Sequence, residues 1–164
     1  MAYQIRISPP QRHTLFDLRG TPQALAARLQ GIVPNLPTQP CSLVRHGQGT
    51  LMWLGPLRWC LMAPPEAEAA LEAALMQGPA DHDAAITLIS DTQAFFRISG
   101  RDAAVAMSIA CPLDLHPTAF GVDHVALTDA FGVRALVLRE GDDWMLGLEP
   151  SYAAYVEAQL RQIV

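Results

Sequence analysis

Two short apolar stretches of the chain, residues 15–19 and 95–99, have the pattern of half-buried β-strands. Each stretch alternates or runs apolar over a strand's length, which is the period that a pleated, partly buried segment requires. Each is followed at once by a glycine, Gly20 or Gly100, and glycine commonly interrupts a strand. The pattern therefore predicts one strand closed by a glycine in each half of the chain.

Three helices are predicted from start signals that contain proline. Thr21 and Pro22 supply an N-cap and a proline at the first helical position, and residues 23–30 follow as a helix. Residues 65–76 and 150–163 start with a proline in the same way, and the second of these has apolar residues at helical spacing. The helix at residues 65–76 is expected to end the first half of the chain, and the helix at residues 150–163 to end the second.

Hairpins are predicted between the helices. Residues 43–46 and 50–54 form strands around a Gly-Gln-Gly turn, and a three-stranded meander is predicted at residues 125–128, 133–139 and 144–148. A further strand is expected around Trp59. Each half of the chain therefore combines strands and helices in a similar order.

The two halves resemble each other in sequence. When residues 59–75 are set against residues 144–160, seven of seventeen positions are identical, including Trp59 with Trp144 and Pro65 with Pro150. Upstream the offset is 80, with residues 16–20 on 96–100 and Ala24 and Ala26 on Ala104 and Ala106.

This self-similarity predicts a duplicated strand-helix-strands-helix unit of the α+β class. The whole chain, residues 1–164, is expected to be one domain of two pseudo-repeats, at about 11–78 and 91–164, with the boundary near residues 77–83. Antiparallel or mixed sheets with helices packed on one face would accommodate both halves.

Composition excludes several classes of function. The chain has no lysine, so it lacks the amine for Schiff-base chemistry and the lysine of a P-loop. Its net charge is −5 and its arginines are scattered, which argues against nucleic acid and against an anionic membrane surface. Charged residues make up only 16% of the chain, which is typical of a protein that hides apolar surface in a complex.

The three cysteines, Cys41, Cys60 and Cys111, have no C-x-x-C spacing, so neither a disulfide framework nor a zinc site is predicted. The first ten residues lack the apolar core of a signal peptide, and no stretch reaches the length of a membrane span. We therefore expect a cytoplasmic protein with reduced thiols.

One block of the chain has a distinctive sequence, Cys-Pro-Leu-Asp-Leu-His-Pro-Thr-Ala-Phe at residues 111–120, preceded by Phe-Phe-Arg-Ile-Ser-Gly-Arg at residues 95–101. Pro112 and Pro117 restrict the residues before them, so the block is expected to form a stiff loop that follows a helix ending by about Cys111. One interpretation is a rigid connection between a helix and a strand. The other is a surface that presents side chains to a partner chain, with these as the interface candidates: Leu113, Asp114, His116 and Phe120.

This block resembles the gamma subunits of heterotetrameric sarcosine oxidase, and the resemblance continues from Phe95 through the Trp144 strand to Val164. The preceding part matches only in general shape. The resemblance implies a fold related to the folate-binding fold of aminomethyltransferases. It also implies alpha, beta and delta partner subunits and a parent reaction that converts sarcosine to glycine, hydrogen peroxide and 5,10-methylenetetrahydrofolate. FAD, FMN, NAD and tetrahydrofolate are then expected on the partners, with no cofactor on this chain, which would brace the assembly.

The residues themselves offer no convincing catalytic, cofactor-binding or metal site. His116 and His124 lie eight apart in a loop without a second ligand pair, and Cys111 precedes a proline at a helix end, where a thiol is not activated. Trp59 and Trp144 stand at equivalent repeat positions, which favours core packing over stacking on a pterin or flavin; Trp53 is interpreted in the same way.

Two alternatives remain. The chain could be an autonomous folate-binding aminomethyltransferase-like protein with Asp114 or Asp129 near the pterin amines, although the lysine-glycine-cysteine motif of folate-linked repair proteins is absent. It could also be a scaffold subunit of a related dehydrogenase that acts on an N-methyl amino acid such as N-methylglutamate. The isolated chain could self-associate when its partners are missing.

Overall fold

The computed structural model describes residues 3–33, 35–47, 49–77 and 82–163. The chain divides into two compact units: the N-terminal unit, His13–Ser90, and the C-terminal unit, which combines Met1–Arg12 with Asp91–Val164. Each is an α+β unit with an antiparallel sheet, as the sequence predicts. The pseudo-repeat boundary expected at residues 77–83 falls largely on positions outside the described residues; the units meet in sequence between Ser90 and Asp91.

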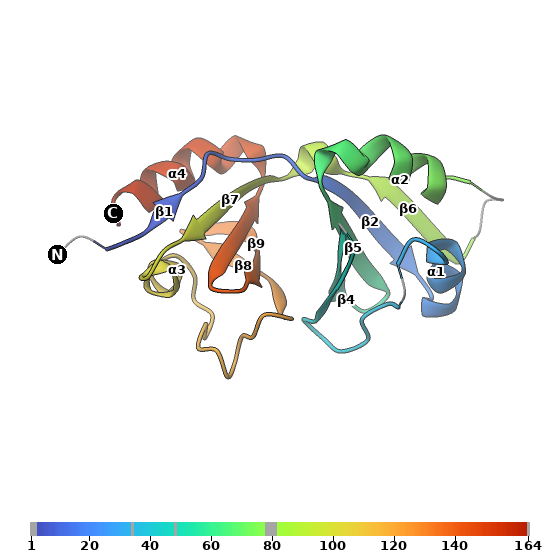
Figure 1. The fold of residues 1–164 in the computed structure, drawn as a ribbon, viewed down its shortest axis with the longest axis horizontal. Helices are drawn as coiled ribbons and strands as arrows, with labels where there is room; N and C mark the ends of the chain where they lie inside the picture. Colours follow the sequence, from blue (N-terminus) through green and yellow to red (C-terminus); the bar gives the residue numbers. More distant parts are fainter. Residues whose placement is uncertain (1–2, 34, 48, 78–81, 164) are drawn as a thin grey trace. The chain divides into compact units, whose positions relative to one another are not determined.

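The N-terminal unit has a sheet of strand order β3-β4-β5-β2-β6, in which every neighbouring pair is antiparallel (Figure 1). Its elements in chain order are β2 (Thr14–Gly20), α1 (Pro22–Leu29), β3 (Leu43–His46), β4 (Gly49–Gly55), β5 (Arg58–Ala63), the 3-10 turn η1 (Pro65–Ala67), α2 (Glu68–Leu75) and β6 (Ala84–Leu88). A short 3-10 turn, η2 (Ser90–Thr92), follows β6 and connects the N-terminal unit to the C-terminal unit.

The C-terminal unit has the strand order β1-β7-β10-β9-β8, again with antiparallel neighbours throughout. Its elements are β1 (Arg6–Ile7), β7 (Ala94–Ser99), α3 (Ala103–Ala110), β8 (Val125–Ala130), β9 (Val133–Glu140), β10 (Asp143–Leu148), η3 (Pro150–Tyr152) and α4 (Ala153–Arg161). The predicted hairpin and meander are both present.

The two sheets have the same topology, so the predicted duplication is a property of the fold. Strands β2, β5, β4 and β3 take the places of β7, β10, β9 and β8. The outermost strands are exchanged: β1, from the start of the chain, pairs with β7, whereas β6, just before β7 in sequence, pairs with β2. The short strand that precedes each repeat in sequence thus pairs in the sheet of the other repeat.

In each unit both helices pack on the same face of the sheet, as predicted. The N-terminal core joins Leu25 of α1 and Leu75 of α2 to Phe16, Leu51 and Leu61 of the sheet. The C-terminal core has the same construction, with these fully buried members: Ala106 and Met107 from α3, Val156 and Leu160 from α4, and Phe96, Ile98, Val137 and Leu146 from the sheet. Large apolar side chains that leave water in this way supply most of the stabilisation of each unit.

One part of the sequence alignment between repeats needs correction. Helices α1 and α3 begin 81 positions apart, at Pro22 and Ala103, although the strands before them align at an offset of 80. One extra residue stands between Gly100 and α3. The alanine matches at this point of the sequence comparison, Ala24 with Ala104 and Ala26 with Ala106, are therefore not structural equivalents.

Candidate functional site

The distinctive loop at residues 111–124 begins where α3 ends. Cys111 has φ −132° and ψ 135°, so it leaves the helix in an extended conformation, as a residue before a proline does. Its backbone N–H still donates to the carbonyl oxygen of Met107. The prediction that the helix ends by Cys111 is confirmed, and Pro112 explains the position of that end.

Asp114 and His116 shape the loop from within. Asp114 Oδ1 accepts a hydrogen bond from the backbone N–H of His116 at 3.0 Å, which is the local bond that aspartate makes in an Asx turn. His116 Nδ1 lies 2.7 Å from Thr118 Oγ1, and the His116 carbonyl accepts the N–H groups of Ala119 and Phe120, each at 2.8 Å. Both side chains are exposed, so they hold the loop's shape and also face solvent.

Phe120 lies in the C-terminal core and is only 5% exposed. Its ring centroid is 5.7 Å from that of Trp144 and 5.6 Å from that of His124. Leu113 is partly buried against the same core. The expectation that Phe120 is presented at the surface is therefore corrected: two of the four interface candidates, Asp114 and His116, are exposed, and their contact with a partner stays a prediction.

The histidines of the loop are separated by their own local bonds. His124 Nδ1 accepts the backbone N–H of Gly121 at 3.1 Å, while His116 bonds to Thr118. Across the residues that the structure describes, no cluster of three or more His, Cys, Asp or Glu side chains is arranged to hold a metal ion.

The tryptophans lie in the two cores. Trp59, 3% exposed, donates its indole N–H to the Pro37 carbonyl at 2.8 Å. Trp144, 1% exposed, has the Arg139 guanidinium carbon 5.5 Å from its ring centroid. Trp53 packs partly buried against the N-terminal core. Their rings are thus occupied by packing, as the repeat positions suggested.

One polar group escaped the sequence analysis. Asp17 on β2 is 8% exposed and is paired with two arginines, Arg19 Nε at 2.7 Å and Arg58 Nε at 2.8 Å. Cys60 lies opposite Asp17 in the register of β2 and β5. Burial, with a smaller contribution from the Asp17 carboxylate, raises the pKa of the Cys60 thiol to about 12, so this thiol is protonated and unreactive at neutral pH. A single polar residue inside an apolar strand was the available signal.

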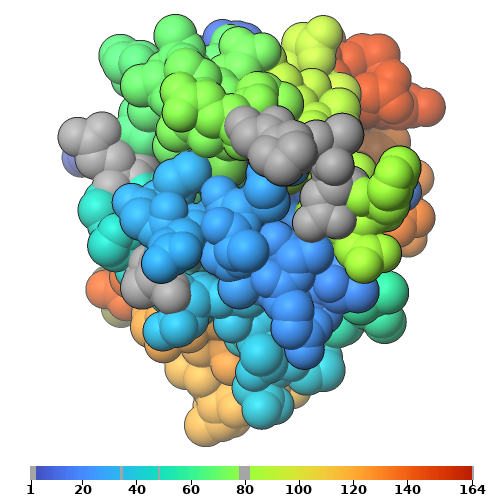
Figure 2. Space-filling view, turned by 90° about the vertical axis from the view of Figure 1, so that its right-hand side faces the viewer, coloured from blue at the N-terminus to red at the C-terminus, as the bar shows by residue number. Residues whose placement is uncertain are grey.

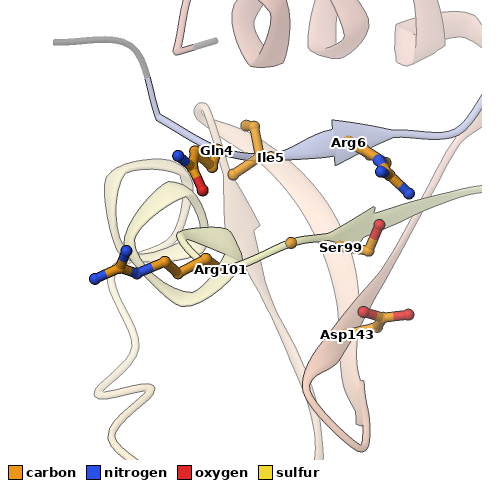
Figure 3. Close-up of a pocket in the computed structure, with 7 residues that line it drawn as sticks. Gln4, Ile5, Arg6, Ser99, Arg101 and Asp143 are labelled. Carbon is orange, nitrogen blue, oxygen red and sulfur yellow. The ribbon is translucent and has the colours of Figure 1, made fainter.

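The C-terminal unit has an open cavity of about 600 Å³ between β1, the end of β7 and the start of β10 (Figure 3). Arg6 and Ser99 are register partners on β1 and β7, and they lie with Asp143 of β10 on one side of the cavity, whereas Arg101 points away on the other side. Asp143 is also paired with Arg97, at 3.3 Å. Because the two arginines diverge, this cavity does not form a convergent anion site.

The pterin-binding candidates of the alternative hypothesis are not gathered in such a cavity. Asp129, on β8, and Asp114 are both exposed, and Asp114 is turned to the backbone of its own loop. The described part of the chain contains no helix that is long and apolar enough to cross a membrane.

Comparison with known proteins gives solved structures of the same fold. The chain superposes on heterotetrameric sarcosine oxidase from Corynebacterium sp. U-96, in complex with pyrrole 2-carboxylate, with a TM-score of 0.77 and 23% identity over 97% of this chain and 85% of that chain. It superposes on the glycine cleavage system aminomethyltransferase T from Bartonella henselae with a TM-score of 0.71 and 14% identity, over 97% of this chain and 46% of that chain. At these identities the likeness establishes the fold, which is the one that the resemblance implied.

Sequence relatives are more specific. The gamma subunit of sarcosine oxidase from Corynebacterium sp. (strain P-1) is 31% identical over 118 residues, and that from an Arthrobacter species is 33% identical over 122 residues. These matches take in 71% and 73% of this chain, and the chain spans 57% of the length of each relative. The family model for the sarcosine oxidase gamma subunit matches residues 19–163, which extends the resemblance into the first half of the chain. The chain therefore belongs to the sarcosine oxidase gamma subunit family.

Proposed function

We propose that this chain is the gamma-type subunit of a heterotetrameric sarcosine oxidase and that it acts as an assembly subunit without an active site of its own. Family membership carries the first part of the proposal. The second part is supported by how the chain uses its chemically versatile side chains. Asp114, His116 and His124 bond within one loop, and Asp17 is held by two arginines.

The aromatic side chains support the same division of labour. Trp59, Trp144 and Phe120 are each at most 5% exposed, so none of these three presents a ring face on which a flavin or pterin could stack. The thiol of Cys60 is buried and protonated at neutral pH. The buried aromatic rings and the Cys60 thiol therefore act in packing, and under this proposal the catalytic groups are on the partner subunits.

The parent reaction and its participants belong to the proposal. Alpha, beta and delta-type subunits would accompany this chain in the cytoplasm, with FAD, FMN, NAD and tetrahydrofolate on the partners. The complex would convert sarcosine to glycine, hydrogen peroxide and 5,10-methylenetetrahydrofolate. A related complex acting on another N-methyl amino acid would use the same kind of subunit.

A second candidate, autonomous folate binding, is favoured by the likeness to aminomethyltransferase T, which extends over nearly the whole of this chain but less than half of that one. It predicts measurable affinity of the isolated chain for tetrahydrofolate. Equilibrium dialysis with tetrahydrofolate tests this candidate directly, and saturable binding would favour it over the assembly role.

The deciding experiment is capture of the tagged chain from its own cells followed by native mass spectrometry. We expect a stoichiometric complex that contains two larger flavin-bearing chains and a small fourth subunit. Consumption of sarcosine and of N-methylglutamate by that complex, each measured with oxygen and with an artificial electron acceptor, then identifies the substrate. Recovery of the chain alone or as a homodimer would overturn the assembly role.

A further inference from the structure

Helix α3 has no polar face. Its eight residues are Ala-Ala-Val-Ala-Met-Ser-Ile-Ala, without a charged or amide side chain. One side is buried in the C-terminal core. The opposite side, which we call the α3 outer face, consists of Ala104, Val105, Ser108 and Ile109, all exposed. Val105 is 42% exposed and Ile109 is 52% exposed.

The one hydroxyl on the α3 outer face is used internally. Ser108 Oγ donates to the carbonyl oxygen of Val105 at 2.7 Å, so it does not make the face polar. A helix that is apolar on all sides is ordinarily buried on all sides. The α3 outer face therefore has the composition of a covered surface, although the C-terminal unit leaves it open.

The other repeat supplies a matched comparison. Helix α1 begins 81 positions before α3, and its residues at the places of Val105 and Ile109 are Ala24 and Arg28. Gln23 and Ala27 complete its outward side, and Arg28 donates to the Leu75 carbonyl at 2.6 Å. Figure 2 shows this helix, in blue, at the surface of the N-terminal unit. The N-terminal unit thus folds with small or polar residues on the outward side of α1. Folding alone therefore does not require the apolar residues Val105 and Ile109 on the outward side of α3.

The charges next to the α3 outer face are unbalanced. Arg101, exposed just before the helix, is not bonded to any carboxylate in the described parts of the chain. The neighbouring carboxylate, Asp102, instead accepts the backbone N–H of Gln4 at 2.8 Å. Figure 3 shows the Arg101 side chain extending away from the strands. An apolar face with an unneutralised cation at its end is complementary to an apolar surface that carries a carboxylate.

Building on the proposed function, we propose that the α3 outer face together with Arg101 is the surface on which another subunit of the heterotetramer docks. That subunit contributes an apolar patch against Val105 and Ile109 and a carboxylate against Arg101. A second copy of this chain is the weaker occupant, because it would bring the same Arg101 and a second net charge of −5 to the contact.

The test uses Ile109→Glu and Arg101→Glu in the tagged chain, expressed in its own cells. The control is Ala27→Glu, an exposed position on the outward side of α1 at the place of Ser108. A carboxylate at position 109 would be buried without a partner, and reversal at position 101 would place two carboxylates together. We expect each variant to lower the recovered partner subunits per tagged chain by about tenfold or more, a change that corresponds to ~1.4 kcal/mol. Ala27→Glu should match the wild type.

Two further measurements keep the result interpretable. Thermal unfolding of each isolated variant distinguishes a lost contact from a lost fold, because all three substitutions are on exposed positions and should leave Tm near the wild-type value. Hydrogen exchange on the unaltered chain compares residues 103–110 in the complex and alone, and we expect stronger protection in the complex.

The outcomes are distinct. If the wild type is captured with partners and both variants retain them, with no added protection over residues 103–110, the docking surface is wrong while the proposed function stands. If the wild type is captured alone, the proposed function fails. If the variants break only a homodimer of the isolated chain, a second copy covers this face and the inference is overturned.

Discussion

Gly20 and Gly100 hold the same place in the two repeats, and each lies against the backbone where the short strand that precedes the other repeat begins. A Cβ built on Gly20 would lie 2.1 Å from the Asp83 carbonyl oxygen, and one built on Gly100 would lie 2.4 Å from the Gln4 carbonyl oxygen. Both glycines have positive φ, +144° and +111°. The Asp83 carbonyl also accepts the backbone N–H of Thr21, and the Gln4 carbonyl accepts that of Asp102. The close approach at each glycine and the hydrogen bond that follows it therefore involve the same carbonyl group.

Replacement of either glycine by alanine should destabilise the chain. The new methyl group overlaps backbone that cannot move without breaking the pairing of β6 or β1, and the positive φ disfavours alanine further. We expect Gly20→Ala and Gly100→Ala each to lower the free energy of unfolding by about 2–4 kcal/mol, measured by urea denaturation.

Gly132→Ala is the control, because Gly132 has a φ of +78° but no atom of the described residues within 4 Å of the place that an alanine Cβ would take. Only the conformational effect remains there, and it should amount to about 1 kcal/mol. Equal losses in the free energy of unfolding for Gly100→Ala and Gly132→Ala would show that the close contact of Gly100 with the Gln4 carbonyl adds no steric cost.

The two equivalent tryptophans differ in their hydrogen bonds. Trp59 donates to Pro37, whereas the buried Trp144 Nε1 has no acceptor among the described residues. Phenylalanine at position 59 would leave the Pro37 carbonyl without its donor, but at position 144 no such bond is lost. We expect Trp59→Phe to lower the free energy of unfolding by about 1 kcal/mol more than Trp144→Phe. The pair of urea titrations gives the difference, and an equal loss would show that the Pro37 bond contributes nothing net.

Stability at alkaline pH should depend on Cys60. The ordinary pKa of this thiol is 9.0, and in the folded chain burial raises it to about 12. Between these values the unfolded chain has lost the thiol proton and the folded chain retains it. The free energy of unfolding therefore falls by up to about 1.4 kcal/mol per pH unit as pH rises. Below pH 9 both states hold the proton and the effect disappears.

Urea titrations at pH 8 and pH 10.5 test this dependence. Cys60→Ala should remove part of the loss seen in the wild type between the two pH values. Cys41→Ala should leave it unchanged, because Cys41 is exposed. The same alkaline loss in Cys60→Ala and the wild type would place the effect on other groups.

The sequence was most informative where local signals and repetition agreed. Proline starts located η1 and η3, the 85-residue offset matched Trp59 to Trp144, and the glycines closed β2 and β7. Strands β1 and β6 were missed, because a two-residue strand has no readable period and β6 is stabilised by its pairing with distant β2. Exchange between repeats is a long-range pairing that periodicity cannot reveal.

The candidate site was only partly predictable for a related reason. Pro112 and Pro117 predicted a stiff loop, but the sequence of residues 111–120 does not determine which side chains are buried. Phe120 turns inward because Trp144 and the C-terminal core offer it an apolar surface. The ion pairs of Asp17 likewise depend on Arg58, which the fold brings from a different strand.

The distinctive loop can now be tested with its two roles separated. Phe120→Ala removes a buried ring beside Trp144, so we expect it to lower the free energy of unfolding of the isolated chain by about 3–5 kcal/mol. His116→Ala leaves the core intact and removes one exposed side chain with its bond to Thr118, so the loss should be about 1 kcal/mol or less. If the loop also contacts a partner subunit, His116→Ala will reduce recovery of the complex while leaving Tm nearly unchanged. Full recovery of the complex with His116→Ala and with Asp114→Ala would show that the loop is a structural connection whose polar groups serve its own shape.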